Sequence, residues 1–251
     1  MSPTPLTQVR IVIVEPAGAI NVGSIARIMK NMGLSRLVLV DPRCDPFSED
    51  ARNMAVHAID VLESAQIVKT LPEALIGVQR AIATTVRERS SDLPLEPPRT
   101  ALPWLLESDV ESALLFGSEY RGLSNDELKY AQRCISIDSS PIYRSLNLAQ
   151  AVAICCYELY QLVAISASHT SEGTVLDPKA AQPTASLDVL EQYYQQLEDT
   201  LLKIGYLQPH TASSRMEKFR RMFNRATLTD AEVAMLRGIL RQIEWAANLK
   251  N

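Results

Sequence analysis

The sequence predicts an α/β fold with a mostly parallel sheet, followed by a small all-helical extension. Three observations support this fold class. Short β-rich runs alternate with helical patterns over residues 1–165, an alternation typical of parallel sheets. Residues 166–186 (SASHTSEGTVLDPKAAQPTAS) are small, polar and proline-bearing, which indicates a linker. Residues 187–251 then carry helical patterns only, and this predicts a separate helical domain.

The first elements are the most clearly bounded. The run VRIVIVE, residues 9–15, is β-rich and is followed by proline and glycine, which predicts a buried strand. A helix is expected over residues 21–33, because apolar residues recur there at helical spacing and Gly33 can end it. The run RLVLVDP, residues 36–42, predicts a second strand that ends at Pro42.

The same alternation continues to residue 165. A helical region is expected over residues 48–79, and short helices are expected after residue 100 and over 127–133. A long apolar helix is expected over residues 145–165. The remaining strands are predicted at residues 80–86, 112–119 and 134–139.

The extension is expected to contain three helices, over residues 187–206, 213–225 and 230–249. In the first, apolar residues step by three or four and form one stripe, made of Leu187, Leu190, Tyr194, Leu197, Leu201 and Ile204. Three such helices can form a small bundle or a docking arm.

The composition indicates an ordinary soluble globular protein, with 47% hydrophobic and 22% charged residues. The longest apolar region, 146–165, contains several polar residues, so a core helix is favoured over a membrane span. The first ten residues lack a signal-peptide pattern. The four cysteines lack the spacing of a zinc site, and the adjacent Cys155 and Cys156 fit a buried helix face. We therefore expect a cytoplasmic protein without a metal; the net charge of −4 argues only weakly against nucleic acid.

Four sequence segments follow predicted strands and so lie at the carboxyl edge of the sheet, where α/β proteins bind ligands. They are residues 15–27, 84–89, 116–123 and 139–147. The first, EPAGAINVGSIAR, has glycines spaced as in a P-loop but lacks the lysine that such a loop needs. Each segment also has a plainer interpretation: glycines in tight turns, a serine that caps a helix, or an arginine on a solvated surface.

The residues at this edge exclude several kinds of active site. The three histidines are far apart in sequence, and the chain lacks the H-E-x-x-H and G-x-S-x-G motifs. What remains is Arg, Asn, Ser and Glu around glycine turns, a set suited to positioning polar oxygens. Such a set favours a group transfer in which a cosubstrate carries the chemistry.

Three of these segments together resemble a known family. They read N-x-G-x-x-x-R from Asn21 to Arg27, F-G-x-E-x-x-G-L from Phe116 to Leu123, and S-L-N-L-A-x-A from Ser145 to Ala151. In this order they resemble the three motifs of the SpoU RNA ribose methyltransferases, which belong to the SPOUT superfamily. The helical tail is similar to that of the tRNA 2′-O-methyltransferases in this family, so the resemblance covers nearly the whole chain.

The resemblance implies a fold and a set of binding partners. Members fold as an α/β knot, work as homodimers and use S-adenosyl-L-methionine as the methyl donor. The cofactor site of the family corresponds here to backbone and side-chain groups of eight residues. They are Thr84, Thr85, Val86, Gly117, Ile137, Arg144, Ser145 and Leu146.

By the same resemblance, the stretch EPAGAINVGSIAR faces the acceptor ribose. The implied catalytic residues are Arg27, Asn21, Glu119, Ser145 and Asn147. Methyl transfer is an in-line displacement that needs a positioned 2′-hydroxyl. A guanidinium is almost always protonated, so we interpret Arg27 as a group that orients the hydroxyl and stabilises charge, with a role as general base left open.

A basic segment in the tail is a separate candidate. Residues 215–225 (RMEKFRRMFNR) carry five basic residues and one acidic residue. Met216, Phe219 and Phe223 are expected to face the bundle and to leave the basic side chains outward. A solvated helix face is the plainer alternative, but beside an RNA methyltransferase domain this pattern favours phosphate binding. The candidate RNA-binding residues are Arg87, Arg89, Lys218, Arg221 and Arg225.

The sequence and the resemblance together predict a tRNA methyltransferase that acts on a ribose 2′-oxygen of the anticodon loop, at position 32. Two alternatives stay open at this point. One is a ribosomal RNA methyltransferase of the same family, and the other is a non-catalytic RNA-binding protein that keeps the fold.

Overall fold

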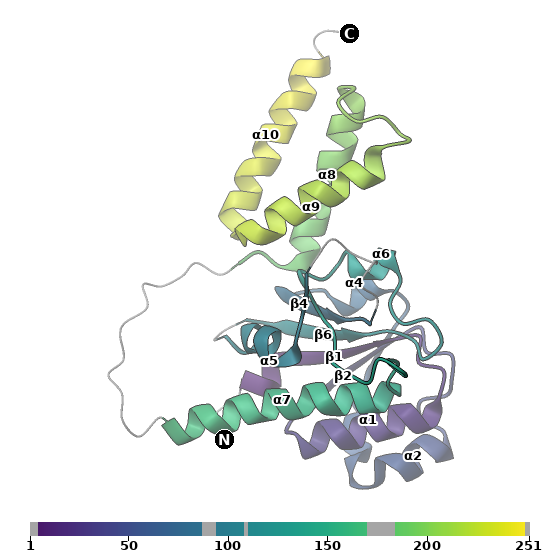
Figure 1. Cartoon of the computed structure of the whole chain (residues 1–251). Coiled ribbons are helices and arrows are strands. Elements are labelled where there is room, and N and C mark those ends of the chain that lie inside the picture. Colours follow the sequence, from purple (N-terminus) through teal and green to yellow (C-terminus); the bar gives the residue numbers. More distant parts are fainter. Residues whose placement is uncertain (1–4, 87–93, 108–109, 170–183, 249–251) are drawn as a thin grey trace. The chain divides into compact units, whose positions relative to one another are not determined.

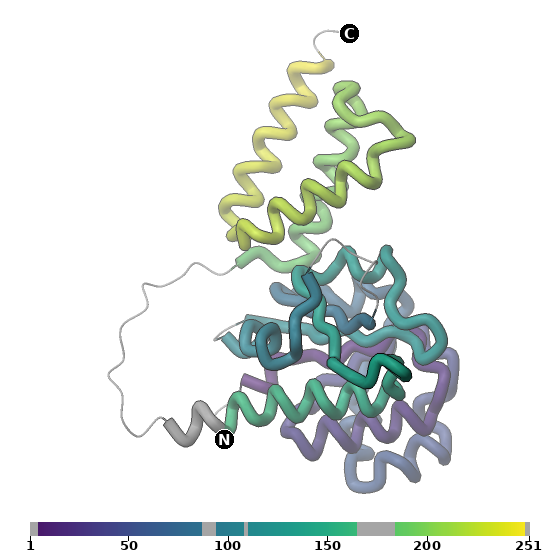
Figure 2. Tube along the Cα trace, in the orientation of Figure 1, coloured from purple at the N-terminus to yellow at the C-terminus, as the bar shows by residue number. Residues whose placement is uncertain are grey.

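A computed structural model describes residues 5–86, 94–107, 110–169 and 184–248 (Figure 1). The chain divides into two compact units, Met1–Leu176 and Asp177–Asn251. The first is an α/β unit and the second is helical, as Figure 2 shows along the Cα trace. The predicted fold class is therefore confirmed.

The α/β unit is built on a seven-stranded sheet with the order β3-β2-β1-β6-β4-β7-β5. Every strand pair is parallel, so the sheet is entirely rather than mostly parallel. The strands are β1 (Val9–Val14), β2 (Arg36–Val40), β3 (Gln66–Val68), β4 (Arg80–Thr84), β5 (Leu95–Glu96), β6 (Ser112–Phe116) and β7 (Arg133–Ile135).

Helices cover both faces of this sheet (Figure 1). Alternate strand residues such as Ile11 and Ile13 pack into a core cluster with α1 and α7, whereas Val12 is fully buried outside that cluster. Burial of both faces explains why the central strands are continuous apolar runs. The helices of the unit are α1 (Ala19–Asn31), α2 (Glu49–Ala55), α3 (Ile59–Glu63), α4 (Leu71–Ala74), α5 (Pro98–Ala101), α6 (Asn125–Leu128) and α7 (Leu148–His169), with 3-10 turns η1 (Pro5–Gln8), η2 (Val56–Ala58) and η3 (Leu102–Leu106).

Two strands were not expected. β3 lies inside the region predicted as helical, 48–79, and β5 lies in a segment predicted as a loop. Both are short and lie at the two edges of the sheet. Their residues are exposed or half-buried, and such strands lack the apolar run that identifies a buried strand.

Several predicted boundaries also shift. β6 ends at Phe116, where Gly117 begins a loop, and β7 ends at Ile135, so both are shorter than expected. The helix predicted at 127–133 is α6, which starts earlier because Ser124 and Glu127 form a capping box. The last helix, α7, starts at Leu148 rather than at 145 and continues to His169, past the expected end at 165.

The helical unit contains α8 (Leu187–Lys203), α9 (Ala212–Ala226) and α10 (Asp230–Asn248). They enclose their own core, which includes Leu190, Tyr194 and Leu197 from the predicted stripe. Ile204 of that stripe is 42% exposed, because α8 ends just before it. The helices therefore form a small bundle.

The expected orientation of α9 is largely confirmed. Met216 is buried in the bundle core, and Phe219 and Phe223 pack against it. Arg220, however, does not point outward with the other basic residues. Its guanidinium donates two hydrogen bonds to Glu191, at 2.5 and 2.8 Å, and lies 4.5 Å from the ring centre of Tyr194.

Candidate active site

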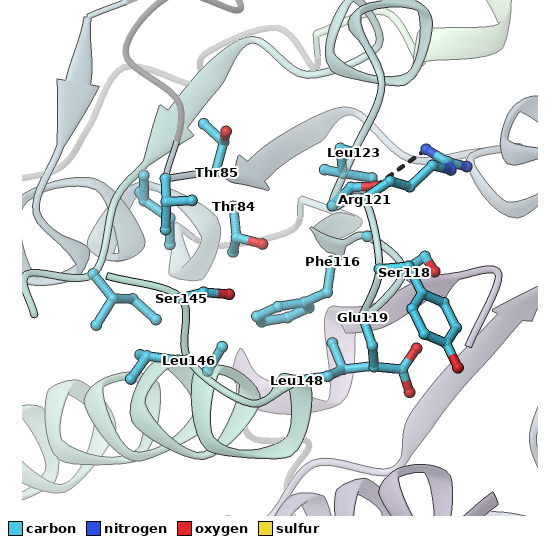
Figure 3. A pocket seen from close by; sticks show the side chains of 17 residues that line it. Thr84, Thr85, Phe116, Ser118, Glu119, Arg121, Leu123, Ser145, Leu146 and Leu148 are labelled. Atoms are coloured by element: carbon cyan, nitrogen blue, oxygen red, sulfur yellow. Dashed lines mark hydrogen bonds between the residues drawn. The ribbon is translucent and has the colours of Figure 1, made fainter. Parts of the chain in front are cut away.

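A pocket of about 210 Å³ lies at the carboxyl edge of β4, β6 and β7 (Figure 3). Its floor is apolar and is formed by Phe116, Leu123, Ile135, Leu148 and Ala151. Its rim comes from the loops that follow the strands and from the segment before α7. The pocket therefore lies where an α/β sheet is expected to bind a ligand.

Most of the residues predicted for the cofactor line this one pocket. They are Thr84, Thr85, Val86, Gly117, Ile137, Ser145 and Leu146. Arg144 is the exception: it is exposed, and its backbone carbonyl accepts a hydrogen bond from the Ser139 hydroxyl at 2.9 Å. The structure thus brings seven of the eight predicted residues together, although their role in binding a cofactor stays a prediction.

The sequence analysis missed the apolar floor of the pocket. Phe116 and Leu123 stand at the two ends of the motif F-G-x-E-x-x-G-L, and Leu148 and Ala151 lie in the motif S-L-N-L-A-x-A. Their places in these motifs were the available signal. Ile135, the last residue of β7, could have been found only from its place at the end of a strand.

The loop after β6 depends on glycine for the path of its own backbone. A Cβ on Gly117 would lie 2.0 Å from the carbonyl carbon of Gly122 and 2.2 Å from the nitrogen of Leu123. Gly122 has a φ of +68°, a conformation that glycine adopts readily. The interpretation of Gly117 as a glycine in a tight turn is therefore confirmed, because this turn by itself requires glycine.

Glu119 joins this loop to the start of α1. Its carboxylate accepts hydrogen bonds from the Ala17 nitrogen at 2.9 Å, the Gly18 nitrogen at 3.2 Å and the Asn21 amide at 2.8 Å. Partial burial opposes ionisation of Glu119, but these hydrogen bonds outweigh it and lower the pKa of the carboxyl. The charged carboxylate therefore stabilises the N-terminus of α1.

Asn147 brings in the third predicted motif. Its side-chain Nδ2 donates to the Asn21 side-chain Oδ1 at 3.1 Å, and its own side-chain Oδ1 accepts from the Ala149 backbone nitrogen at 2.9 Å. Asn147 therefore caps α7, and the plainer interpretation of Ser145 as the cap is wrong. The chain Asn147–Asn21–Glu119 joins three of the five predicted catalytic residues in one hydrogen-bonded row.

Arg27 is exposed on α1, six residues after Asn21, which lies in the first turn of this helix. No hydrogen bond or ion pair joins its guanidinium to another described residue. Gly23 lies between Asn21 and Arg27, and a Cβ there would approach the Ala51 carbonyl oxygen to 2.1 Å. Gly23 is therefore needed for close packing of α1 on α2, while Arg27 is available for a ligand.

A second arginine is held firmly beside the pocket. Arg121 donates to Glu15 at 2.6 Å and to both oxygens of Glu127 at 2.8 Å. The hydrogen bonds with Glu127 and Glu15 raise the pKa of Arg121, and those from Arg43 and Arg121 lower the pKa of Glu15. This cluster links the end of β1 to the loop after β6.

The predicted RNA-binding residues are distributed over the two units. Lys218 and Arg225 are exposed on α9, and Arg221 is half-buried there. The Arg221 Nε donates to the Glu217 carbonyl at 3.4 Å. Arg87 and Arg89 lie outside the described residues, so their placement stays a prediction.

Two further features concern metals and membranes. In the described part of the chain, no group of three or more His, Cys, Asp or Glu side chains is arranged to hold a metal ion. Cys155 and Cys156 are fully buried, as predicted, and burial raises the pKa of Cys155 to about 12. None of the described helices combines the length and apolar character needed to cross a membrane.

Comparisons with known proteins agree with both units. A model of the SpoU rRNA methylase family matches residues 8–157. A model of the C-terminal domain of the tRNA methyltransferase TrmJ matches residues 188–251. The two matches fall on the α/β unit and the helical unit, respectively.

Individual relatives are similar over nearly their whole length. The tRNA (cytidine/uridine-2′-O-)-methyltransferase TrmJ of Klebsiella pneumoniae is 40% identical, over 95% of this chain and 97% of its own. The tRNA (cytidine/uridine/adenosine-2′-O-)-methyltransferase TrmJ of Pseudomonas aeruginosa is 38% identical, over 96% of each chain. The crystal structure of TrmJ from Z. mobilis ZM4 is similar with a TM-score of 0.80 at 31% identity, covering 94% of this chain and 98% of that one.

The family resemblance predicted from three short motifs is thus confirmed independently by the match over the α/β unit and by relatives that share both units. The chain belongs to the SpoU methylase family and carries the C-terminal domain of its TrmJ branch.

Proposed function

We propose that this protein is a tRNA 2′-O-methyltransferase that moves a methyl group from S-adenosyl-L-methionine to a ribose of the anticodon loop, at position 32. The observation that carries the proposal is the hydrogen-bonded row Asn147–Asn21–Glu119 beside the pocket. It joins residues from three separate motifs, and one of these residues, Glu119, lines the pocket. The methyltransferase relatives that share both units support the same activity.

The pocket has the chemistry that S-adenosylmethionine requires. Its apolar floor, with Phe116, Leu123 and Leu148, suits the flat adenine ring. Thr85, Ser145 and the backbone of the rim loops offer hydrogen-bonding groups around that floor. The cofactor supplies an electrophilic methyl group, so the protein needs to bind, orient and exclude water rather than to form a covalent intermediate.

The acceptor side is proposed to lie at Arg27 and the row beside it. The Arg27 guanidinium donates hydrogen bonds to the ribose hydroxyl or the adjacent phosphate and stabilises negative charge there. Hydrogen bonds from Asn21 to Glu119 and from Asn147 to Asn21 fix the start of α1 and the start of α7 relative to Glu119. Ser145 is exposed and lines the pocket, and it is proposed to contribute to both the cofactor side and the acceptor side.

The helical unit is proposed to hold the body of the tRNA. The basic face of α9, with the exposed Lys218 and Arg225 and the half-buried Arg221, suits the phosphate backbone. Arg87 and Arg89 of the α/β unit are also proposed to bind RNA phosphates. The TrmJ C-terminal domain favours tRNA over ribosomal RNA as the substrate.

A homodimer is proposed to form through α7. This helix carries apolar side chains on two faces: Val152, Cys155 and Leu159 are buried in the core, while Ile154, Tyr157 and Tyr160 are exposed at helical spacing. A helix with two apolar faces is expected to be covered on both. The cytoplasmic location and the α/β knot stay predictions that follow from the cysteine usage and the family resemblance.

The decisive experiment is site-by-site mass spectrometry of tRNA nucleosides from a deletion strain. Loss of the 2′-O-methyl group at position 32, restored by the wild-type gene, is the expected result. The purified protein should also methylate unmodified tRNA when S-adenosylmethionine is added. Loss of methylation in ribosomal RNA alone would support the ribosomal alternative, and absent cofactor binding by the folded protein would support the non-catalytic one.

A further inference from the structure

A large aromatic side chain stands almost fully exposed at the edge of the pocket. Tyr120 lies in the loop after β6 and is 88% exposed, although it is one of the residues that line the pocket. No hydrogen bond or ring contact joins its side chain to another described residue. The Tyr120 ring therefore adds almost no buried area to the core of the unit, and the exposure of this large ring needs another explanation.

The backbone that carries Tyr120 is fixed on both sides. Its neighbour Glu119 accepts three hydrogen bonds from the start of α1. Its other neighbour, Arg121, is held by Glu15 and Glu127. Ser118 and Gly122 close the loop through a β-bridge, with a hydrogen bond of 2.8 Å between the Gly122 nitrogen and the Ser118 carbonyl. The tyrosine is thus presented by a rigid turn.

A rigid, exposed aromatic ring is well suited to stacking on a nucleobase. Bases in single-stranded RNA loops are recognised largely by stacking on aromatic side chains. Binding to Tyr120 would cost little conformational entropy, because the loop that carries it is already held in place. Tyr120 is also next in sequence to Glu119, which belongs to the row of proposed acceptor residues.

We propose that Tyr120 stacks on a nucleobase of the anticodon loop, at or next to the methylated nucleotide. This inference rests on the proposed function and adds a binding residue to it. Every base has a flat face, so stacking tolerates different bases. A platform of this kind holds a pyrimidine or a purine at the acceptor site without reading its hydrogen-bonding edge.

The first test compares Tyr120→Ala with Tyr120→Phe. Loss of one stacked base weakens binding by roughly tenfold, so Tyr120→Ala should raise the Kd for an unmodified tRNA transcript by about that factor. Tyr120→Phe should bind like the wild type, because the ring is kept. A phenylalanine variant as weak as the alanine variant would overturn stacking and assign the contact to the hydroxyl.

The second test locates the stacked base. Anticodon stem–loops with one abasic loop nucleotide at a time are bound to the wild type and to Tyr120→Ala. At one position the abasic change and Tyr120→Ala should not add, since both remove the same stacking interaction. Additive effects at every position would overturn the proposal.

Controls separate this inference from the others. The salt dependence of tRNA binding should stay at its wild-type value, because the substitution removes no group that binds phosphate. Ile76→Ala removes another exposed apolar side chain (59% exposed), just before β4 at the opposite edge of the sheet, and should bind tRNA normally.

A change in sedimentation of Tyr120→Ala would show that a second copy covers the ring and overturn the proposal. Absence of methylation by the wild type would instead contradict the proposed function.

Discussion

The stretch 15–27 and the loop 116–123 are joined through Glu119, but the arginines that they carry, Arg27 and Arg121, differ in their partners. Arg27 is exposed on α1 and has no described partner. Arg121 is held by the carboxylates of Glu15 and Glu127, each at less than 3 Å. One arginine is therefore available to a ligand, while the other stabilises the loop that carries Glu119.

The glycines of these two segments are more alike than their arginines. A Cβ on Gly23 would lie 2.1 Å from the backbone of Ala51 in α2, and a Cβ on Gly117 would lie 2.0 Å from the backbone of Gly122 in the same loop. In both segments, glycine allows the close approach of two pieces of backbone. The comparison teaches that the motif glycines build the site, whereas the polar side chains beside them are the groups that can act on a substrate.

The largest effect is expected at Arg27. If Arg27 stabilises charge in the transition state, Arg27→Ala should lower kcat by about 10²- to 10³-fold. Its affinities for tRNA and S-adenosylhomocysteine should change far less. Steady-state kinetics with both substrates, together with calorimetric titration of the cofactor product, measure this. Arg52→Ala is the matched control, because Arg52 is an arginine on α2 paired with Glu63, and it should keep normal turnover.

Arg27→Lys sharpens the assignment of a role. Lysine keeps the charge but loses the planar fork, so an electrostatic role predicts partial activity, whereas bidentate orientation predicts almost none. A rate that rises with pH in this variant would favour a role as general base, because lysine has the lower pKa. If Arg27→Ala methylates tRNA at the normal rate, Arg27 is only a solvated surface charge, and its difference from Arg121 has no functional meaning.

The next largest effect is expected on stability at Gly117. Gly117→Ala places a methyl group against the backbone of Gly122 and Leu123, and such overpacking costs roughly 1–3 kcal/mol or more. Thermal unfolding should show a clear fall in Tm. Gly238→Ala in α10 is the control: its Cβ meets only the Arg241 side chain at 3.9 Å. It should raise stability by about 0.5–1 kcal/mol. An unchanged Tm in Gly117→Ala would contradict the packing role.

A smaller effect is expected for Glu119→Gln, which removes the charge that both segments share. Hydrogen bonds to charged groups contribute about 1.5–3 kcal/mol, and partial exposure reduces this, so we expect a loss of about 1 kcal/mol at neutral pH. The folded pKa of Glu119 lies below its ordinary value. Its contribution is therefore complete above that ordinary value and is lost as the pH falls through the folded pKa.

The measurement is denaturant unfolding of the wild type and Glu119→Gln over a range of pH. The difference between the two should shrink as the solution becomes acidic. Asp126→Asn is a suitable control, because Asp126 is a carboxylate with 93% side-chain exposure and a single surface ion pair, and it should show little difference at any pH. A stability gap that stays constant down to acid pH would argue against an ionised Glu119.

A separate effect, on RNA binding, is expected on the basic face of α9. Replacing Lys218, Arg221 and Arg225 together by alanine should weaken tRNA binding by on the order of tenfold and reduce its salt slope by about 0.7–0.9 for each phosphate that is no longer neutralised. Filter binding at several salt concentrations measures both. Cofactor affinity should not change. Wild-type affinity and slope in the triple variant would mean that this face is only solvated surface.

Much of the molecule could be predicted from local patterns. The central strands are buried on both faces, so each is a continuous apolar run, and α9 shows its core side through the spacing of Met216, Phe219 and Phe223. Local patterns failed to predict elements and orientations that are not accompanied by a run of buried apolar residues. The edge strands β3 and β5 are short and partly exposed, and the inward Arg220 carries the same charge as its outward neighbours.

By itself, then, the sequence determined the order of the central elements, the two kinds of unit and the family, because periodicity and motif spacing are properties of neighbouring residues. Tertiary structure alone decided which groups meet. Asn147 contacts Asn21 across 126 positions of the chain, and Glu119 reaches the start of α1 across about 100. The same residues supply a cap for α7 and a link between motifs, and only the folded chain reveals both roles. The physical reason is that parallel strands bring their carboxyl ends to one edge whatever their separation in sequence.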